Sequence, residues 1–366
     1  MARFKPKHNN VQAFLHPVTL LIAAYNEEKI ISEKLENALS IDYPRELFQI
    51  LVAADGSTDR TPDIVRKYNS QSIELNYIPE RSGKMAAINR AMNFARGEIV
   101  VFSDANNMYE KNTIRALIAP FSDPQVGATT GAKLIIEDGR DLSSAEGMYW
   151  KYEAFIKKSE AMLGSCVSSV GEILAIRKRL YISPSEKIIN DDHYIVLDLI
   201  RRGFRVLFIP EARSFEYVSD TVKDEKERRS RMNAGLYQTI SMSAKLLPFN
   251  RPLELWEILS HKYLRALVPF AMVFALLSNM FLVLFQENNK NHGLWQLPST
   301  FSATLLIIQI LFYGMALLGN IVKLPTVMSK LFYLPTFLVN PNLASVKGLY
   351  IYLTNKQSHL WKRVDR

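Results

Sequence analysis

Three polar segments hold residues that could do chemistry, and each directly follows an apolar run of strand length. They are Tyr25–Glu28, Asp55–Asp59 and Asp104–Asn106. Carboxylates that gather in one place repel one another unless a cation or a hydrogen-bonding ligand lies among them. For each segment taken alone, the alternative is capping of the following helix, by Ser57, Asp59 or Asn112. Three such segments in one sheet favour a shared binding site.

Basic residues could complete this site. Arg81–Lys84 begins a helical pattern, where backbone amides and the helix dipole favour anions, so Lys84 could meet a phosphate. The segment is not a P-loop, because the spacing GxxxxGK[ST] is absent. The run Lys223–Arg231 is, by itself, typical of a solvated helix face. Beside an acidic site, Arg228 and Arg231 become candidates for holding a diphosphate.

The elements that must position these residues alternate along the chain. Apolar runs of strand length lie at Val18–Ala24, Gln49–Ala54, Ile73–Tyr77, Ile99–Ser103 and Val126–Ala132. Helical patterns lie between them at Glu28–Leu39, Thr61–Tyr68, Lys84–Ala95 and Asn112–Phe121. This alternation predicts an α/β fold, with a mainly parallel sheet covered by helices on both faces. In such sheets ligands bind beyond the carboxyl ends of the strands, where the polar segments lie.

The last third of the chain is apolar and basic. Ala266–Phe285 and Leu294–Val322 contain no charged residue, and each reaches the roughly twenty apolar residues that a bilayer core requires. Buried core helices are the alternative, but their uncharged length favours two transmembrane helices. A transporter is disfavoured, because a translocation site normally places a charge within a span. A third apolar segment, Leu331–Asn355, is broken by Pro335 and Pro341, and we expect it to be re-entrant or interfacial rather than spanning.

Charge and cysteine content limit the function and the compartment. Most of the net charge of +9 lies after His261, so the preceding body is nearly neutral and unlike a nucleic-acid-binding protein. Basic residues flank the two spans on one side, at Lys262, Arg265, Lys323 and Lys330. The positive-inside rule then places the body and the tail in the cytoplasm, on a multi-pass protein of the cell membrane. The single cysteine, Cys166, is consistent with a reducing compartment.

These patterns predict five regions. We expect a cytoplasmic catalytic domain over 1–245, an amphipathic juxtamembrane linker over 246–265, two transmembrane helices within 266–322, a third apolar segment over 331–355 and a basic tail over 356–366.

The order of the motifs resembles the family-2 glycosyltransferases of the cellulose-synthase-like branch. The resemblance runs from about Pro17 to Gln238. Six segments match family motifs in order: the first strand end at Ala24–Glu27, the Asp-Gly-Ser motif at Asp55–Ser57, the Gly-Lys helix at Gly83–Lys84, the metal motif at Asp104–Asn106, the Glu-Asp motif at Asn190–Asp192 and a variant of Gln-x-x-Arg-Trp at Arg228–Met232.

The resemblance implies an inverting enzyme that moves a sugar from a nucleotide sugar, with a UDP-sugar as the first expectation. Asp192 would be the catalytic base, with Asp191 as its neighbour. Asp104 and Asn106 would bind Mg²⁺ or Mn²⁺. The residues expected at the donor are Asn26, Glu27, Asp55, Lys84, Arg228 and Arg231. The acceptor would be a lipid-linked sugar or a growing glycan, in cell-surface polysaccharide or glycolipid synthesis, and a homo-oligomer is left open.

Two departures from the family pattern matter. Asn106 replaces the usual second acid of the metal motif, so less charge faces the cation. Arg228 and Met232 replace the Gln and Trp associated with processive synthases, and two spans are few for a polysaccharide channel. We therefore expect addition of single sugars rather than processive synthesis. A catalytically inactive membrane scaffold is the other alternative, and the intact Asp55, Asp104 and Asp192 argue against it.

Overall fold

The computed structural model describes residues 15–68, 72–136, 141–217, 222–285, 299–321 and 326–356. These residues fall into two compact units. The globular unit contains the described residues up to Glu225 together with Gln238–Ile258. The helical unit contains Lys226–Tyr237 together with the described residues from Leu259 onward. The predicted polar loop after Phe285 and the basic tail beyond Lys356 lie outside the described residues.

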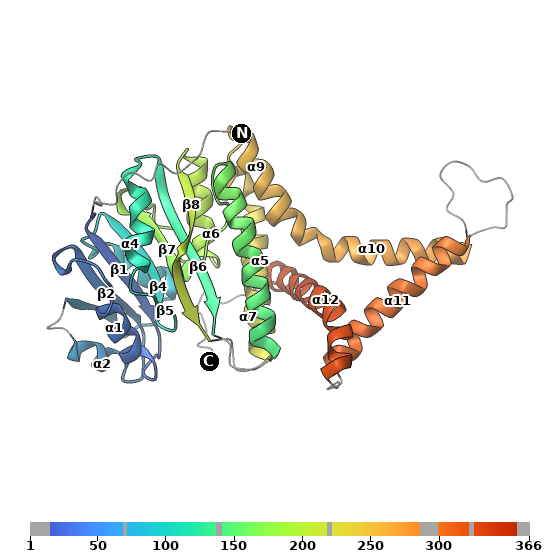
Figure 1. Cartoon of the computed structure of the whole chain (residues 1–366), viewed down its shortest axis with the longest axis horizontal. Helices are drawn as coiled ribbons and strands as arrows, with labels where there is room; N and C mark the ends of the chain where they lie inside the picture. Colours follow the sequence, from blue (N-terminus) through green and yellow to red (C-terminus); the bar gives the residue numbers. More distant parts are fainter. Residues whose placement is uncertain are drawn as a thin grey trace. The chain divides into compact units, whose positions relative to one another are not determined.

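The globular unit is built around one sheet, and its described strands run in the order β3-β2-β1-β4-β7-β6-β8-β5 (Figure 1). Their bounds are β1 (Val18–Ala24), β2 (Phe48–Asp55), β3 (Ile73–Ile78), β4 (Ile99–Asp104), β5 (Met108–Tyr109), β6 (Val126–Ile135), β7 (Leu174–Arg177) and β8 (Arg205–Glu216).

Strand direction decides which strand ends meet. β1 is parallel to β2 and β4, and β2 is parallel to β3. β7 is antiparallel to both β4 and β6, so β6 and its parallel neighbour β8 run in the same direction as β1. The short β5 is antiparallel to β8. The predicted α/β sheet is confirmed, as a mixed sheet with two antiparallel members.

The central strands form where uninterrupted apolar runs predict them. Every residue of β1 and of β2 is buried, as expected for strands that have helices on both sides. The described helices of this unit are α1 (Ile31–Leu39), α2 (Thr61–Lys67), α3 (Lys84–Met92), α4 (Thr113–Ile118), α5 (Asp141–Leu163), α6 (Asp191–Arg201), α8 (Ser243–Leu246) and α9 (Pro252–Ile258). α1 begins after the predicted Glu28, because Asn26 has a left-handed φ of 53° and the chain turns before it becomes helical.

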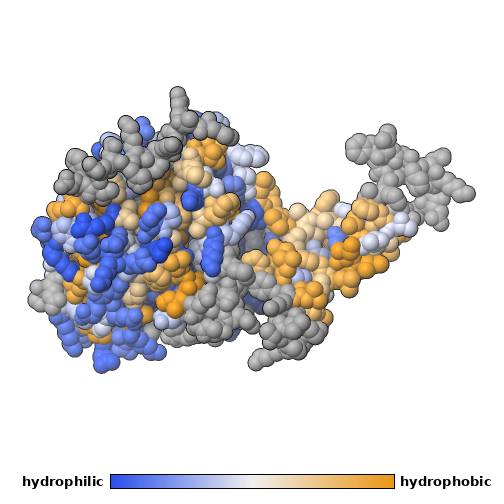
Figure 2. Space-filling view, viewed as in Figure 1, coloured by the Kyte–Doolittle hydropathy of each residue, from blue (hydrophilic) through white to orange (hydrophobic). Residues whose placement is uncertain are grey.

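The helical unit holds α10 (Leu264–Phe285), α11 (Ser299–Ile321) and α12 (Thr326–Leu353), together with the middle of α7 (Val222–Ser241). Two stretches of the described chain, Pro252–Phe285 and Thr300–Ile321, are long and apolar enough to cross a membrane. Large apolar side chains remain exposed on α10 and α11, and Figure 2 shows them as an orange surface. Exposed apolar surface of this extent favours contact with lipid or protein over contact with water.

The third apolar segment is a helix in the structure. α12 contains Pro335 and Pro341 and packs on α11. A Cβ at Gly319 of α11 would lie 2.5 Å from Thr336 Oγ1 of α12, so the two helices approach closely only because residue 319 is glycine. The side-chain amides of Asn320 and Asn340 exchange two hydrogen bonds, of 2.9 and 3.0 Å. Small residues and paired amides are typical of helices that pack in an apolar medium. Whether α12 crosses a membrane stays a prediction.

Candidate active site

The three polar segments meet at one edge of the sheet. β1 lies between β2 and β4 and is parallel to both. Their register pairs Ala24 with Ala54 and Ala23 with Asp104, so the three strands end side by side. The residues that follow β1, β2 and β4 therefore lie at a common carboxyl edge, as the alternating pattern predicts.

Hydrogen bonds tie the first two segments together. The Asn26 backbone amide donates to Ser57 Oγ over 3.1 Å, and Asn26 Oδ1 accepts from the Thr58 amide over 2.8 Å. The Glu28 amide donates to Asp59 Oδ2 over 3.0 Å. Ser57 thus binds the neighbouring loop rather than capping a helix, whereas Asp59 does both, since its Oδ1 also accepts from the amide of Thr61, the first residue of α2.

Asp55 shapes the site from within. Its side chain is fully buried, and its carboxylate accepts from the backbone amides of Ser82, over 3.1 Å, and Gly83, over 2.7 Å. This contact fixes the turn from which α3 begins, and so it fixes the position of Lys84. Contact between Asp55 and a donor nucleotide stays a prediction.

Lys84 is the point at which the acidic residues converge. Its Nζ donates to Asp104 Oδ1 over 2.7 Å. Burial lowers the pKa of Lys84, but the carboxylates of Asp104, Asp191 and Asp192 outweigh burial and raise it above its ordinary value. Lys84 is therefore ion-paired with Asp104 of β4, and it also responds to the charges of Asp191 and Asp192 at the start of α6.

Asp192 lies in the first turn of α6, and its Oδ2 accepts from Ser169 Oγ over 3.2 Å. Burial raises the pKa of Asp192, and the adjacent charge of Asp191 raises it further, against the opposing effects of Lys84 and Ser169. A carboxylate with a raised pKa is a stronger base toward a hydroxyl group. A Cβ at Gly171 would lie 3.3 Å from the Cβ of Asp192, so glycine leaves room for this side chain.

The residues of the predicted metal motif suit a hard divalent cation. The Asp104 side chain is 36% exposed, and Asn106 Nδ2 donates to Glu216 Oε1 over 3.0 Å. With its nitrogen held by Glu216, Asn106 has its carbonyl oxygen to offer a cation. Among the described residues, no cluster of three or more His, Cys, Asp or Glu side chains is arranged to hold a metal ion. The protein thus offers few ligands, and Mg²⁺ or Mn²⁺ bound here would take further oxygens from water or phosphate.

A buried polar network supports this motif from below. Glu216 is 3% exposed and forms an ion pair with Lys133, which also donates to Glu172 Oε2 over 2.8 Å. Ser214 Oγ donates to Glu172 Oε1 over 3.0 Å. Sequence reasoning assigned no role to Lys133, Ser214 or Glu216. The sequence offered one signal, which is that Lys133 is the single charged residue within β6. A charge in a buried strand needs a partner of opposite charge.

Lys34 belongs to the same support. It is fully buried in α1, and its Nζ donates to the backbone carbonyl of Asn107, directly after the metal motif. Burial lowers the pKa of Lys34 to about 7, against the attraction of Glu172 and Asp104. Asn107 Nδ2 in turn donates to Ser214 Oγ over 2.9 Å. The loop after β4 is therefore held by buried side chains from α1 and β8.

The predicted phosphate-binding arginines lie in the other unit. Arg228 and Arg231 are on the part of α7 that belongs to the helical unit. Arg228 Nη1 contacts Met232 Sδ, one turn further along the same helix, over 3.5 Å. Their predicted role at the donor stays a prediction.

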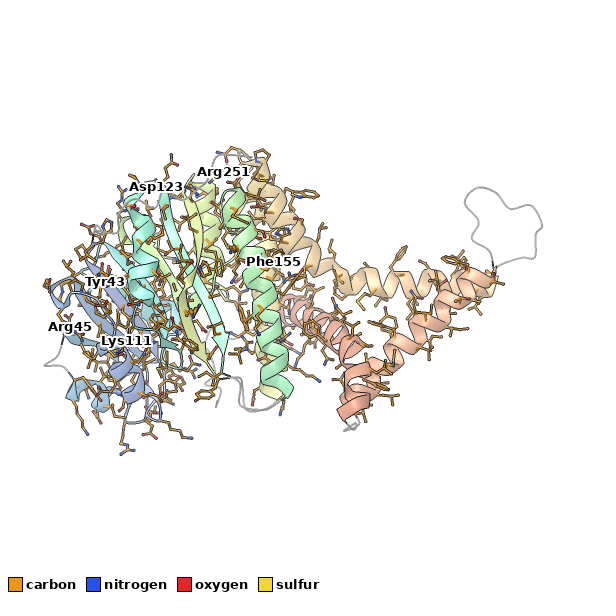
Figure 3. The ribbon with its side chains drawn as sticks, in the orientation of Figure 1. Tyr43, Arg45, Lys111, Asp123, Phe155 and Arg251 are labelled. Carbon is orange, nitrogen blue, oxygen red and sulfur yellow. The ribbon has the colours of Figure 1, made fainter. Side chains whose placement is uncertain are left out.

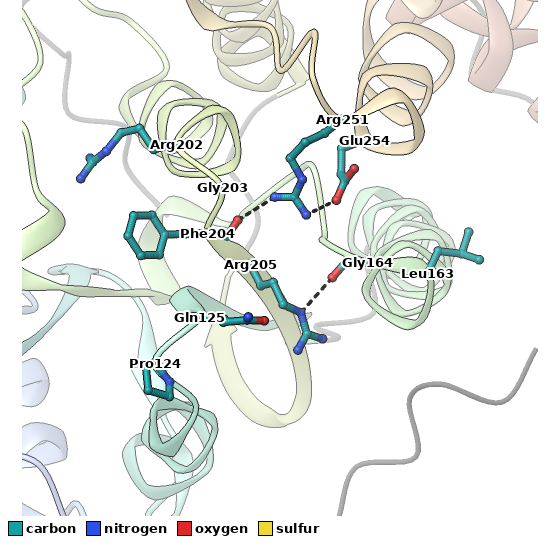
Figure 4. Close-up of a pocket in the computed structure, with 10 residues that line it drawn as sticks. All are labelled: Pro124, Gln125, Leu163, Gly164, Arg202, Gly203, Phe204, Arg205, Arg251 and Glu254. Carbon is teal, nitrogen blue, oxygen red and sulfur yellow. Dashed lines mark hydrogen bonds and ion pairs between the residues drawn. The ribbon is translucent and has the colours of Figure 1, made fainter.

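A cavity of about 470 Å³ lies away from this edge (Figure 4). It is lined by residues next to the amino ends of β6 and β8 and by the ends of α5 and α9, so it is at the edge of the sheet opposite Asp104. Its three arginines are paired with carboxylates: Arg202 with Asp198, Arg205 with Asp123 and Arg251 with Glu254. Arg202 and Arg251 are paired within the ends of α6 and α9, and the pair of Arg205 with Asp123 joins two segments that are distant in sequence, so these groups serve the structure of the globular unit.

Comparison with known proteins agrees with the geometry. The model of the family "Glycosyl transferase family 2" matches residues 19–181. That range ends before Asp191 and contains six of the predicted donor and metal residues: Asn26, Glu27, Asp55, Lys84, Asp104 and Asn106.

The curated proteins that are similar in sequence include the two that follow. The poly-β-1,6-N-acetyl-D-glucosamine synthase of Staphylococcus aureus (strain COL) is 26% identical over 233 residues, which are 62% of this chain and 56% of that protein. The probable glycosyltransferase YdaM of Bacillus subtilis (strain 168) is 23% identical over 276 residues, which are 69% of this chain and 63% of that protein. The chain thus spans less than two thirds of the length of either relative.

One solved structure shares the fold over nearly the whole chain. The mannosyltransferase PcManGT from Pyrobaculum calidifontis, solved in complex with GDP-Man and Mn²⁺, superposes with a TM-score of 0.71. The superposition covers 94% of this chain and 89% of that one, at 23% identity.

Proposed function

We propose that the chain, whose residues 19–181 match the model of the family "Glycosyl transferase family 2", transfers a sugar from a nucleotide sugar to an acceptor hydroxyl at a cell membrane, in the synthesis of a surface polysaccharide or glycolipid. The observation that carries this proposal is the ion pair between Lys84 and Asp104 at the carboxyl edge of the sheet, where the charges of Asp191 and Asp192 also raise the pKa of Lys84. Such an edge can hold a diphosphate and a general base within one site.

The chain's own residues divide the chemistry between them. Asp192 takes the proton from the acceptor hydroxyl while the hydroxyl oxygen bonds to the anomeric carbon of the donor. The bond from that carbon to the diphosphate oxygen breaks in the same step, which inverts the anomeric centre and releases a nucleoside diphosphate. Lys84 faces the negative charge that grows on the leaving group. A divalent cation, Mg²⁺ or Mn²⁺, held by Asp104 and Asn106 would neutralise part of the same charge.

The donor is a nucleotide sugar, and a UDP-sugar is the first to test. PcManGT was solved with GDP-Man, so a guanine nucleotide is the second. The acceptor is a lipid-linked sugar or a growing glycan at the cytoplasmic surface. Two helices of the described chain that could cross a membrane support this location, as do Lys262 and Arg265 directly before the uncharged part of the first.

Processive synthesis is the second candidate function, because the Staphylococcus aureus relative is named as a polymer synthase. Addition of single sugars is favoured because Arg228 and Met232 replace the Gln and Trp that are associated with processive synthases. Product length separates the two: a synthase forms a ladder of oligomers from a single acceptor, whereas a single-addition enzyme stops after one sugar.

A donor panel tests the proposal. The purified full chain in lipid nanodiscs is offered UDP- and GDP-sugars with Mn²⁺ or Mg²⁺, and released nucleoside diphosphate is measured. We expect one donor to give release above background and Asp192→Asn to remove it. If no donor is bound or cleaved while the protein is folded, the proposed function is wrong.

A further inference from the structure

The exposed face of α5 is apolar. Tyr152, Phe155, Met162 and Leu163 are 58%, 69%, 60% and 59% exposed. At about 100° of rotation per residue they lie within one arc of about 100° on the helix surface. The opposite face of α5 packs on β6 and β8. A helix on the surface of a soluble domain turns its apolar stripe inward, so a second apolar stripe that points outward needs another partner.

Charge is distributed unequally around the same helix. From Trp150 to Leu163, the two acids, Glu153 and Glu160, are 4% and 1% exposed. The exposed charged residues are Lys151 and Lys158, which flank the apolar stripe on one side. Between Trp150 and Leu163, the outward face of α5 therefore presents large apolar side chains and lysines, and no acidic side chain. A face that simply met water would be expected to mix both signs.

The apolar surface continues onto α9. A Cβ at Gly164 would lie 4.0 Å from Leu253 Cδ2, which places the end of α5 against α9. Leu253 and Trp256 of α9 are 42% and 64% exposed. α9 opens the stretch Pro252–Phe285, the first of the two that are able to cross a membrane. Tryptophan at the start of such a stretch is typical of the level of the lipid headgroups.

We propose that this surface, which we call the α5–α9 face and which consists of Lys151, Tyr152, Phe155, Lys158, Met162, Leu163, Leu253 and Trp256, binds the surface of a bilayer that contains anionic lipids. The inference rests on the proposed membrane function. The apolar side chains enter the boundary between headgroups and acyl chains, and the two lysines bind anionic headgroups. Phe155, labelled on α5 in Figure 3, is the most exposed apolar residue of the stripe.

A depth probe in the full chain tests the proposal. In a Cys166→Ser background, Phe155→Cys is labelled with the fluorophore NBD, and the protein is placed in nanodiscs whose lipids carry bromine near the top of the acyl chains. We expect bromine to quench most of the emission of this probe. A probe at Asp63→Cys, on the exposed side of α2, is the matched control and should keep its emission. Lys151→Gln/Lys158→Gln should reduce the quenching in nanodiscs with anionic lipid and leave it unchanged in neutral ones.

A third probe, at Phe274→Cys on α10, separates two kinds of failure. Quenching at residue 274 without quenching at residue 155 would overturn the proposal for the α5–α9 face and leave the membrane function standing. Absence of quenching at both would overturn the membrane function and the α5–α9 face with it. A disulfide between two copies of Phe155→Cys in nanodiscs would show that a second copy, not lipid, covers this face.

Discussion

The side-chain amide of Asn106 donates a hydrogen bond to the buried carboxylate of Glu216, over 3.0 Å. Asn106 comes from the loop after β4, and Glu216 is the last residue of β8. An aspartate at position 106 would bring a second carboxylate against Glu216, and like charges repel strongly where water is excluded. The departure from the usual Asp-x-Asp pattern therefore has a structural partner 110 residues away along the chain.

From this hydrogen bond we expect that Asn106→Asp destabilises the protein when it is the only change, and that it is tolerated when Glu216→Gln is made with it. The single variant should lose about 1–3 kcal/mol of unfolding free energy, because a buried acceptor loses its donor. The double variant restores a donor opposite an acceptor and should regain most of this loss. Thermal unfolding in EDTA checks stability, and Mn²⁺ titration checks the site. A single variant as stable as the wild type would contradict the assigned role of Glu216.

Asp192→Asn should lower kcat by about 10²–10⁴-fold, which is the usual contribution of a general base. Nucleotide-sugar binding should remain, because the side chain keeps its size in the first turn of α6. Asp191→Asn is the matched control, since it removes a neighbouring charge and leaves Asp192 in place, so its loss should be smaller. An Asp192→Asn enzyme that kept a tenth of wild-type kcat would rule out the assignment.

The pH profile should reflect the raised pKa of Asp192. The base acts when ionised, so kcat should fall on the acid side at a pH above the ordinary value of 3.8. Ser169 donates to the carboxylate and lowers this pKa. Ser169→Ala should therefore raise the pKa further and move the acid limb to higher pH, with little change in kcat on the plateau. An acid limb that moved downward, or not at all, would show that Asp192 is not the group that titrates.

Asp104→Ala should lose cation-dependent donor binding, whereas Asn106→Ala should weaken it less, because a charged oxygen binds a hard cation better than an amide carbonyl does. Loss of Asp104 also removes the hydrogen-bond partner of Lys84. Donor titrations with and without Mn²⁺ measure both effects. If both variants bound donor equally well in the presence and absence of Mn²⁺, the metal assignment would be wrong.

Lys34 should make the free energy of unfolding vary with pH between about 7 and 10.5. Its pKa is about 7 in the fold, against an ordinary value of 10.5, so between these values the unfolded chain binds more protons. The free energy of unfolding therefore rises with pH between these two pKa values, by at most about 1.4 kcal/mol per pH unit. Below the lower value, the folded protein bears the full cost of burying the charged lysine. Lys34→Met should flatten the rise in unfolding midpoint between pH 7 and pH 10.5, while Lys67→Met, on the exposed end of α2, should not. An unchanged slope in Lys34→Met would contradict the lowered pKa.

Local patterns along the chain were enough to predict the strands and the edge of the sheet at which the site lies. β1, β2 and β4 are continuous apolar runs, and such runs are typical of parallel strands covered on both faces. Parallel strands deliver the residues after their carboxyl ends to a common edge, so Asn26, Asp55 and Asp104 could be placed together from local patterns alone. The order of the motifs was sufficient to identify the family resemblance, which the family model bears out.

The contacts that hold these residues in place could not be read from local patterns and are visible in the folded chain. In the fold, the buried carboxylate of Asp55 accepts hydrogen bonds from the backbone amides of Ser82 and Gly83. Asn106 donates to Glu216, and Lys133 donates to Glu172. These contacts join strands and loops that are far apart in sequence. They arise because β8 lies parallel to β6 and β7 runs antiparallel between β6 and β4. Pairing of distant strands leaves no periodic signal in either segment, so a buried lysine or glutamate shows that a partner must exist, but only the fold brings the two together.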